Sequence, residues 1–219
     1  MLGKATQIFS SLGLLLSVSV HTDIGACKQA FKLNVYKRAA KLCMPLAKHG
    51  DAHAQTLIGV LYAFGQGGLP KDQNQAIHWY QLAADHGDTD GQVSLGVMYE
   101  FGDGGLTRNT TIALKYFRLA AAQGNAMGQN NIGTIYYYGL GGTKKDLGMA
   151  FKYYWLAAEN GDLVGQYHLG VMYEKGEGVT KNLKDAIYWY RRAAKQGNKR
   201  AIRRLNQLEM NKKQDWSDR

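Results

Sequence analysis

The chain has 219 residues, 45% of them apolar, with 27 glycines and only two prolines. This composition supports a packed fold, argues against a disordered chain, and fits one ordinary domain or one short repeat array. The formal net charge is +10, but residues 191–219 hold ten lysines and arginines against Glu209, Asp215 and Asp218, so the remainder is close to balanced. A basic end indicates an acidic partner such as phospholipid, an acidic polymer or nucleic acid, unless it is only a solvated capping helix.

Residues 1–23 have the pattern of a secretory signal peptide. Lys4 is the only charge before His21, and an apolar run from Ile8 to Val20 follows it. That run is too short to span a bilayer comfortably. We therefore expect an exported protein, periplasmic or secreted, cleaved near residue 23. An uncleaved amphipathic anchor or a buried first helix would explain the same residues.

A helical hairpin that caps the repeats is predicted over residues 24–49. Its helices are expected at 26–33 and 36–48, with a turn at Asn34. Pro45 lies within the second helix and favours a kink or an early helix end, because proline removes a backbone donor and crowds the preceding turn.

The two cysteines, Cys27 and Cys43, lie at similar distances on either side of the predicted hairpin turn. In an antiparallel hairpin they would face each other, and facing thiols in an exported chain favour a disulfide. The alternatives are two ordinary buried cysteines, or a lipoprotein in which a lipid on Cys27 anchors the chain to a membrane and Cys43 stays free.

Self-similarity with a step of 36–37 residues dominates the rest of the chain. Glycines recur at Gly50, Gly87, Gly124, Gly161 and Gly197, each is followed by Asp or Asn, and paired alanines recur in the same steps. Four repeats are predicted, at residues 50–86, 87–123, 124–160 and 161–196. A C-terminal capping helix at 197–210 and a basic flexible tail at 211–219 are expected to follow.

Each repeat is predicted to be a pair of helices. Glycine supplies the left-handed conformation that ends one helix, and the Asp or Asn behind it caps the next, as Asp51 would before a helix at 52–64. In the second helix Ala76, Tyr80 and Ala83 share one face. A single hairpin cannot bury such a face, so stacked hairpins must share a core. The predicted fold is all-α, a right-handed α/α superhelical solenoid with capping helices at both ends.

These residues resemble the Sel-1-like repeat, a relative of the tetratricopeptide repeat. The resemblance extends over about residues 36–197, with Gly in place of the first Ala in three repeats and one extra loop residue in three. It implies a superhelix with a concave groove and a role in protein–protein interaction, often in bacterial envelope assembly, signalling or host contact. The first unit shows the pattern best, in Ala54-Gln55, Ile58-Gly59, Tyr62, Gly65, Asp72, Ala76, Trp79-Tyr80, Ala83-Ala84 and Gly87.

Residues suited to catalysis are sparse, and we expect no enzyme, no metal and no cofactor. Ser94 is the only serine within the repeats and has no nucleophile elbow around it. His49 and His53 are four residues apart, but Gly50-Asp51 breaks the helix between them and removes the spacing of a metal pair. The glycine-rich loops lack the Gly-Lys-Ser/Thr ending of a phosphate loop.

Binding is the chemistry that the sequence supports best. By analogy with the tetratricopeptide groove, the first helix of each repeat would line the concave face, where aromatic residues are the usual anchors. The alternative is that some of these aromatic residues pack between neighbouring repeats and do not face the groove. Glu100 and Glu174 would select a basic segment, and because the predicted groove is not basic we expect no nucleic acid. The predicted groove residues are Phe64, Glu100, Phe101, Tyr137, Tyr138, Tyr167 and Glu174.

The sequence therefore predicts an exported, monomeric scaffold that holds a peptide or protein partner in its groove. An alternative from the same resemblance is a cell-wall-fragment or β-lactam-binding protein with weak hydrolase activity. Relatives linked with that activity carry a cysteine pair in each repeat, whereas this chain has one pair in all. An exported effector that acts inside a host cell is a third alternative.

Overall fold

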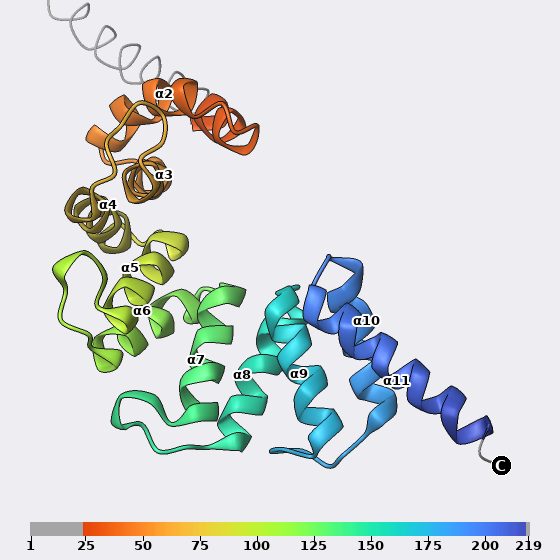
Figure 1. Ribbon diagram of the computed structural model, residues 1–219. Helices are drawn as coiled ribbons and strands as arrows, with labels where there is room; N and C mark the ends of the chain where they lie inside the picture. The colour runs from red at the N-terminus through yellow and green to blue at the C-terminus, as the bar shows by residue number, and fades with distance from the viewer. Residues whose placement is uncertain (1–23, 218–219) are drawn as a thin grey trace, which may run out of the picture. The chain divides into compact units, whose positions relative to one another are not determined.

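The computed structural model describes residues 24–217, with side chains described for residues 24–210 (Figure 1). The predicted signal peptide lies outside the described residues. Over the described range the chain forms helices and no strands, and it divides after Arg108 into two compact units, called unit 1 and unit 2 below. No helix in that range combines the length and the apolar character needed to cross a membrane.

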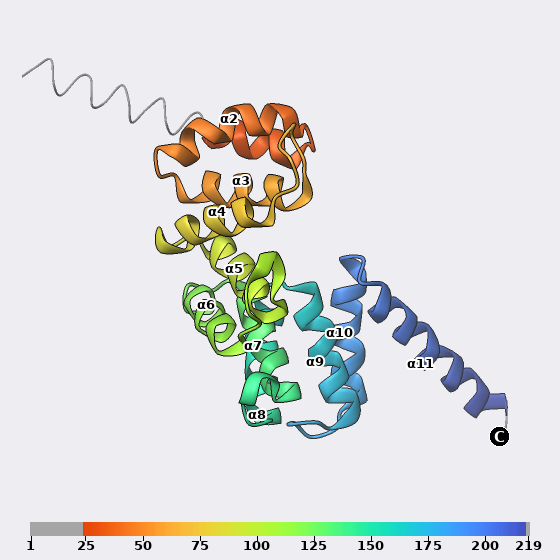
Figure 2. The same cartoon turned by 60° about the vertical axis from the view of Figure 1, so that its left-hand side comes forward.

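Unit 1 begins with a helix over residues 24–32, and its later helices pack on one another in chain order. Figure 2 shows α2, α3 and α4 stacked in this way. Each hairpin thus covers the apolar face that its neighbour cannot bury alone. The labelled helices of unit 1 are α2 (Tyr36–Lys48), α3 (Ala52–Phe64), α4 (Gln73–Asp85), α5 (Thr89–Phe101) and the short 3-10 helix η1 (Asp103–Gly105).

Unit 2 repeats the same arrangement, and each of its helices packs on the next. In both views α8, α9 and α10 lie side by side (Figures 1 and 2). The C-terminal helix packs against α10. The helices of unit 2 are α6 (Thr110–Ala122), α7 (Ala126–Tyr138), the 3-10 helix η2 (Leu140–Gly142), α8 (Leu147–Glu159), α9 (Leu163–Lys175), α10 (Leu183–Lys195) and α11 (Lys199–Ser217).

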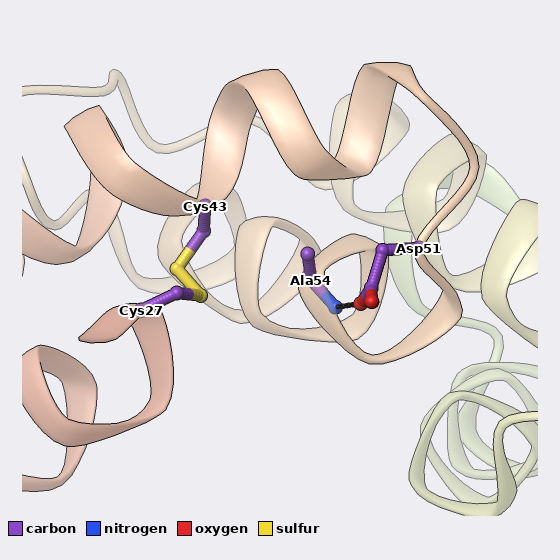
Figure 3. The surroundings of a disulfide bond; sticks show 4 residues. All are labelled: Cys27, Cys43, Asp51 and Ala54. Atoms are coloured by element: carbon purple, nitrogen blue, oxygen red, sulfur yellow. Dashed lines mark hydrogen bonds between the residues drawn. A yellow bond between two sulfur atoms is a disulfide. The ribbon is translucent and has the colours of Figure 1, made fainter. Parts of the chain in front are cut away.

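The helices begin and end at the residues that the repeat pattern predicts. Asp51 caps α3 by accepting from the backbone N–H of Ala54 at 2.7 Å, which Figure 3 shows. Asp72 caps α4 in the same way. Gly65 ends α3 with φ 65°, in the left-handed region. Each side-chain cap stabilises its helix by about 1 kcal/mol, so the boundaries follow from local sequence.

Glycines inside the helices make room for an aromatic residue of the neighbouring helix. A Cβ atom on Gly59 would lie 2.6 Å from the ring of Tyr80, and one on Gly170 would lie 2.6 Å from the ring of Tyr190. Tyr190 is fully buried, so its ring cannot retreat. Glycine is therefore required at these positions, although it costs about 1 kcal/mol relative to alanine within a helix.

Buried glutamines join each hairpin to the next. The Nε2 atom of Gln55 donates to the carbonyl of Ala47 at 3.0 Å, and its Oε1 atom accepts from Nδ1 of His86 at 2.9 Å. In unit 2, Gln166 likewise accepts from Nε2 of Gln196 at 2.9 Å. A buried amide without partners costs about 1–3 kcal/mol. These glutamines therefore favour only the stacked arrangement of hairpins.

The predicted disulfide joins Cys27 in the first helix to Cys43 in α2 (Figure 3). The two Cα atoms are 5.2 Å apart and both side chains are fully buried. Asn34, with φ 58°, turns the chain between the two helices. Because its sulfur is in the disulfide, Cys27 has no thiol left to carry a lipid, which favours the disulfide over the lipoprotein alternative.

The two ends of the array differ in detail from the predictions. Helix α2 runs from Tyr36 through Pro45 to Lys48, as predicted for it, and the early helix end that Pro45 favoured does not occur. Pro45 is on the exposed side of α2, where water can replace the lost backbone donor. At the other end, α11 runs to Ser217, past the predicted end at Met210. The predicted fold class, an all-α solenoid of helix-hairpin repeats, is confirmed.

Candidate functional site

In unit 1, the helices α3 and α5 end in equivalent phenylalanines that are open to solvent. Phe64 and Phe101 are the last residues of their helices and are 68% and 66% exposed. Tyr138 ends α7 of unit 2 at the equivalent position and is 60% exposed. Large aromatic side chains gain most when a partner covers them. These three predicted groove residues are available for such contact.

Glu100, the other predicted site residue of unit 1, is half-buried next to Phe101. Burial raises the pKa of the Glu100 carboxyl, and the charge of Arg108 partly opposes that rise. The Nε atom of Arg108 donates to the carbonyl oxygen of Glu100 at 3.0 Å. A cation therefore already lies beside the carboxylate that was expected to attract a basic segment.

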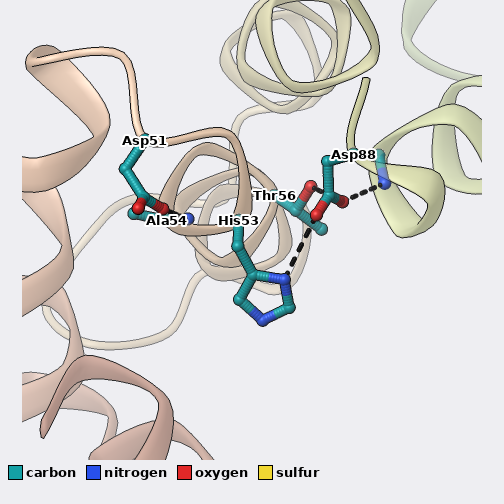
Figure 4. A network of polar contacts seen from close by, with 6 residues as sticks. Asp51, His53, Ala54, Thr56 and Asp88 are labelled. Atoms are coloured by element: carbon teal, nitrogen blue, oxygen red, sulfur yellow. Dashed lines mark hydrogen bonds and ion pairs between the residues drawn. The ribbon is translucent and has the colours of Figure 1, made fainter. Parts of the chain in front are cut away.

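A polar cluster in unit 1 has a structural role. Asp88 caps α5 by accepting from the N–H of Gly91 at 2.8 Å, and it also accepts from Thr56 Oγ1 at 2.7 Å and His53 Nδ1 at 3.2 Å (Figure 4). Burial acts to raise the pKa of Asp88, but these hydrogen bonds outweigh it and hold the pKa below its usual value. The cluster holds α3 against the start of α5, and the hydrogen bond from His53 to Asp88 is one of its contacts.

A hollow of about 190 Å³ in unit 2 collects three of the tyrosines predicted for the groove. We call it the tyrosine hollow. A second hollow beside it shares Tyr167 and Arg200 and adds Arg203, Arg204 and Gln207. Helices α7, α8, α9 and α11 supply the lining of the tyrosine hollow, which is Tyr137, Tyr138, Tyr154, Tyr167, His168, Val171, Lys175 and Arg200.

Glu174, beside the hollow on α9, is held by internal partners. The Arg204 guanidinium donates to both of its carboxylate oxygens, with Nε 2.9 Å from Oε2. The Tyr190 hydroxyl donates to the same Oε2 atom at 2.7 Å. Arg204 is the main cause that holds the pKa of Glu174 below its usual value. This carboxylate therefore fixes α11 against the last repeat, and its charge is offset within the fold.

The other carboxylate near the hollow is also paired. The Tyr137 hydroxyl donates to Glu177 at 2.6 Å, and Lys175 Nζ lies 3.8 Å from the second carboxylate oxygen of Glu177. Burial, together with the hydrogen bond to Glu177, raises the pKa of Tyr137, so its hydroxyl stays protonated and keeps donating. The Nζ atom of Lys145 lies 5.7 Å from the centroid of the Tyr137 ring, on the scale of a cation–π contact.

His168 forms part of the floor of the hollow. Its ring stacks on Tyr154 with centroids 4.7 Å apart and an interplanar angle of 16°. Burial, and to a lesser degree the charge of Arg200, lowers the pKa of His168 to about 4. The imidazole is therefore neutral near pH 7 and behaves there as a flat, partly apolar surface.

Several lining residues were not predicted from the sequence. Arg200 of the C-terminal helix is not among the predicted groove residues, yet it lines the tyrosine hollow. The repeat step would have placed it correctly, because Arg200 and Arg203 follow Val164 and Tyr167 by 36 residues. The interpretation of the groove as not basic is therefore wrong for this hollow.

The described residues offer no evident centre for metal chemistry. Among the residues with described positions, no group of three or more His, Cys, Asp or Glu side chains could hold a metal ion. The hollow instead combines aromatic faces, hydroxyl groups and cationic side chains. Such a surface can bind a ligand through apolar contact and through charge-assisted hydrogen bonds.

The fold is that of an all-α protein built from helix-hairpin repeats. The Sel1 repeat profile matches four segments, residues 52–88, 89–125, 126–162 and 163–198, and the chain belongs to the Sel1 repeat family. Each matched segment begins two residues after the corresponding predicted repeat. Sel1 repeat proteins are generally scaffolds for protein interaction and are typically not enzymes.

Solved structures of Sel1 repeat proteins are similar to this chain. A Sel1 repeat protein from Oxalobacter formigenes is 31% identical with a TM-score of 0.68, over 78% of this chain and 49% of its own. The protein c5321, a protective antigen present in uropathogenic Escherichia coli strains, is 32% identical with a TM-score of 0.68, over 85% of this chain and 42% of its own. This chain thus spans less than half the length of either protein. A comparison with curated proteins gave no match.

Proposed function

We propose that this protein is an exported, monomeric, non-enzymatic scaffold that binds a peptide or protein partner through the exposed ends of the first helices of its repeats. The observation that carries the proposal is the set of exposed aromatic residues at equivalent ends of these helices, Phe64, Phe101 and Tyr138. Each of these residues directly precedes the glycine that ends its helix, and the repeat pattern does not require an aromatic side chain at that position. Aromatic side chains left in water at such positions favour a surface that a partner covers.

Export is supported by the disulfide between Cys27 and Cys43. Structural disulfides form and persist in oxidising compartments and are rare in the bacterial cytosol. The predicted signal peptide, which lies outside the described residues, agrees with this location. The similarity to c5321, described as a protective antigen, supports a place at the cell envelope or at the host interface.

Site-specific cross-linking in cells tests the proposal. A photoreactive phenylalanine analogue replaces Tyr138 in one variant and Tyr188, an exposed residue of α10, in a matched variant. We expect a discrete cross-linked partner from position 138 and none from position 188. The same adduct should weaken when Phe64→Ala and Phe101→Ala are added, and should persist when the exposed Leu119 of α6 is changed to alanine. An adduct indifferent to both phenylalanines would show that this surface is not the binding surface.

A further inference from the structure

The tyrosine hollow joins aromatic surface to an excess of positive charge. Its tyrosines come from α7, α8 and α9, and the second hollow beside it adds cations from α11. The two hollows share Tyr167 and Arg200, so they are adjacent, and together they are called the depression below. A ligand placed there would meet apolar and basic groups together.

The carboxylates next to this depression offset only part of its positive charge. Glu174 is bound by Arg204 and by the Tyr190 hydroxyl. Glu177 accepts from Tyr137 and pairs with Lys175. Each acidic side chain therefore has a cation or a donor of its own within the fold, and no acidic residue is among those that line either hollow.

Two arginines remain for a ligand. Arg200 is exposed and has no carboxylate partner among the residues with described side chains. Among the residues with described side chains, the Nε atom of Arg203 donates to a backbone carbonyl of its own helix, that of Lys199, at 3.3 Å, and Arg203 has no ion pair. A guanidinium group binds a carboxylate through two parallel hydrogen bonds and loses little hydration in doing so.

We propose that the tyrosine hollow binds an acidic segment of a protein partner. In this arrangement the carboxylates of the segment pair with Arg200 and Arg203, and an adjacent apolar side chain lies against Tyr138 and Tyr167. The inference rests on the proposed scaffold function and adds to it the chemical class of the partner. It reverses the expectation from sequence, in which Glu174 would select a basic segment.

A peptide fits this depression better than the other anionic polymers. Binding to nucleic acid draws its affinity from many phosphate contacts along a basic track, whereas the free cations here lie around one small hollow. A membrane surface is broad and flat, whereas these arginines line a concave surface beside aromatic rings. A cavity of about 190 Å³ holds one or two side chains of a peptide.

The test uses the full exported chain and fluorescence anisotropy. The probe is a labelled peptide of three glutamates flanked by leucine and phenylalanine, and the comparison probe has glutamine in place of glutamate. Arg200→Ala and Arg200→Glu remove or reverse the charge, while Arg200→Lys keeps it. Arg191→Ala, an exposed arginine of α10 that lines neither hollow, is the matched control. Thermal unfolding checks that every variant is folded.

We expect the glutamate peptide to bind more tightly than the glutamine peptide, with an affinity that falls as salt rises. Arg200→Ala should weaken binding about tenfold or more, Arg200→Glu should abolish it, and Arg200→Lys should retain part of it. The control Arg191→Ala should stay within about twofold of the original.

Several results would overturn the inference. These are equal binding of the two peptides, equal losses from Arg191→Ala and Arg200→Ala, or no binding of the glutamate peptide up to about 1 mM. Arg200-dependent binding of a single-stranded oligonucleotide or of phosphatidylglycerol vesicles without peptide binding would also overturn it. If the cross-linked partner still depends on Phe64 and Phe101 in that case, the scaffold function stands and only the acidic partner is wrong.

Discussion

Arg204 of α11 forms a two-armed ion pair with Glu174 of α9, so the helix that follows the last repeat closes onto the first helix of that repeat. The Tyr190 hydroxyl of α10 donates to the same carboxylate at 2.7 Å, which brings three consecutive helices to one point. This pair therefore fixes the orientation of α11 against the fourth repeat. The same orientation places Arg200 at the tyrosine hollow.

Breaking this pair is expected to loosen the C-terminal cap. A double-mutant cycle of Glu174→Gln and Arg204→Met should give a coupling energy of about 1 kcal/mol at pH 7, since the pair is bidentate but partly open to water. Because the pKa of Glu174 is lowered, chiefly by Arg204, the stabilisation is present above the usual glutamate pKa and is lost as the pH falls through the lowered value. Urea unfolding at pH 7 and at pH 3 measures both effects.

The comparison pair for that cycle is Lys175 and Glu177. Their closest charged atoms are 3.8 Å apart and the lysine is 55% exposed, so the coupling from Lys175→Met and Glu177→Gln should be near zero. Equal coupling in the two cycles would contradict a structural role for Arg204.

Replacing a mid-helix glycine should destabilise unit 2 even though alanine favours helices. In Gly170→Ala the new Cβ atom would lie 2.6 Å from the buried ring of Tyr190, an overlap that costs about 1–3 kcal/mol. Gly148→Ala is the matched control, because its Cβ atom meets nothing closer than 3.4 Å. That variant should be neutral or slightly more stable. Thermal unfolding compares the stability of the two variants. A Gly170→Ala variant more stable than the original chain would contradict the claim that the ring of Tyr190 requires glycine at position 170.

The architecture was predictable because several sequence features recur at the same 36–37-residue step: the glycines that end helices, the Asp or Asn caps that follow them, and the paired alanines. The glycine at position 170 is dictated by the ring of Tyr190, and the cap at Asp51 by its bond to the N–H of Ala54. Both depend on residues in the same or the adjacent helix. The disulfide of Cys27 and Cys43 was predictable for the same reason, since one short turn sets which residues face each other.

The charge of the candidate site was harder to predict. It depends on contacts such as that of Arg204 with Glu174, 30 residues earlier, and on which carboxylates remain unpaired after folding. The pairing of Glu177 with Tyr137, 40 residues earlier, involves a loop residue outside the periodic positions. The position of Arg200 could be predicted, because it follows Val164 by one repeat step of 36 residues. A basic helix after the last repeat is also what a solvated cap requires, so its charge alone does not indicate a binding site.

Removing the disulfide should weaken the N-terminal cap. The crosslink closes a short loop, because the two cysteines are 16 positions apart in the sequence, and the chain-entropy estimate for such a loop is about 3 kcal/mol. The Cys27→Ala/Cys43→Ala variant and the original chain under reducing conditions should therefore both unfold at lower temperature. Reducing agent should have no further effect on the double variant, which serves as the control. An original chain insensitive to reduction would contradict a stabilising disulfide.

His168 should make the stability of unit 2 depend on pH. Its pKa is lowered from 6.5 to about 4, mainly by burial and further by Arg200. The unfolded chain therefore binds a proton at His168 before the folded chain does, so stability falls as the pH drops from 6.5 to 4, by up to about 3 kcal/mol. The groups that share the hollow with the imidazole are Tyr137, Tyr138, Tyr154, Tyr167, Lys175 and Arg200.

The His168→Asn variant isolates this contribution, because Asn131 occupies the equivalent position in the preceding repeat. We expect a flatter dependence of unfolding free energy on pH between 6.5 and 4 in this variant than in the original chain. An NMR titration of the imidazole in the original chain should show a pKa well below that of a free histidine, and Arg200→Ala should raise it slightly. Binding of the glutamate peptide should also raise this pKa, because a carboxylate placed near Arg200 favours the protonated imidazole. A histidine that titrates near 6.5 with and without the peptide would show that the ring is not held in the floor of the hollow.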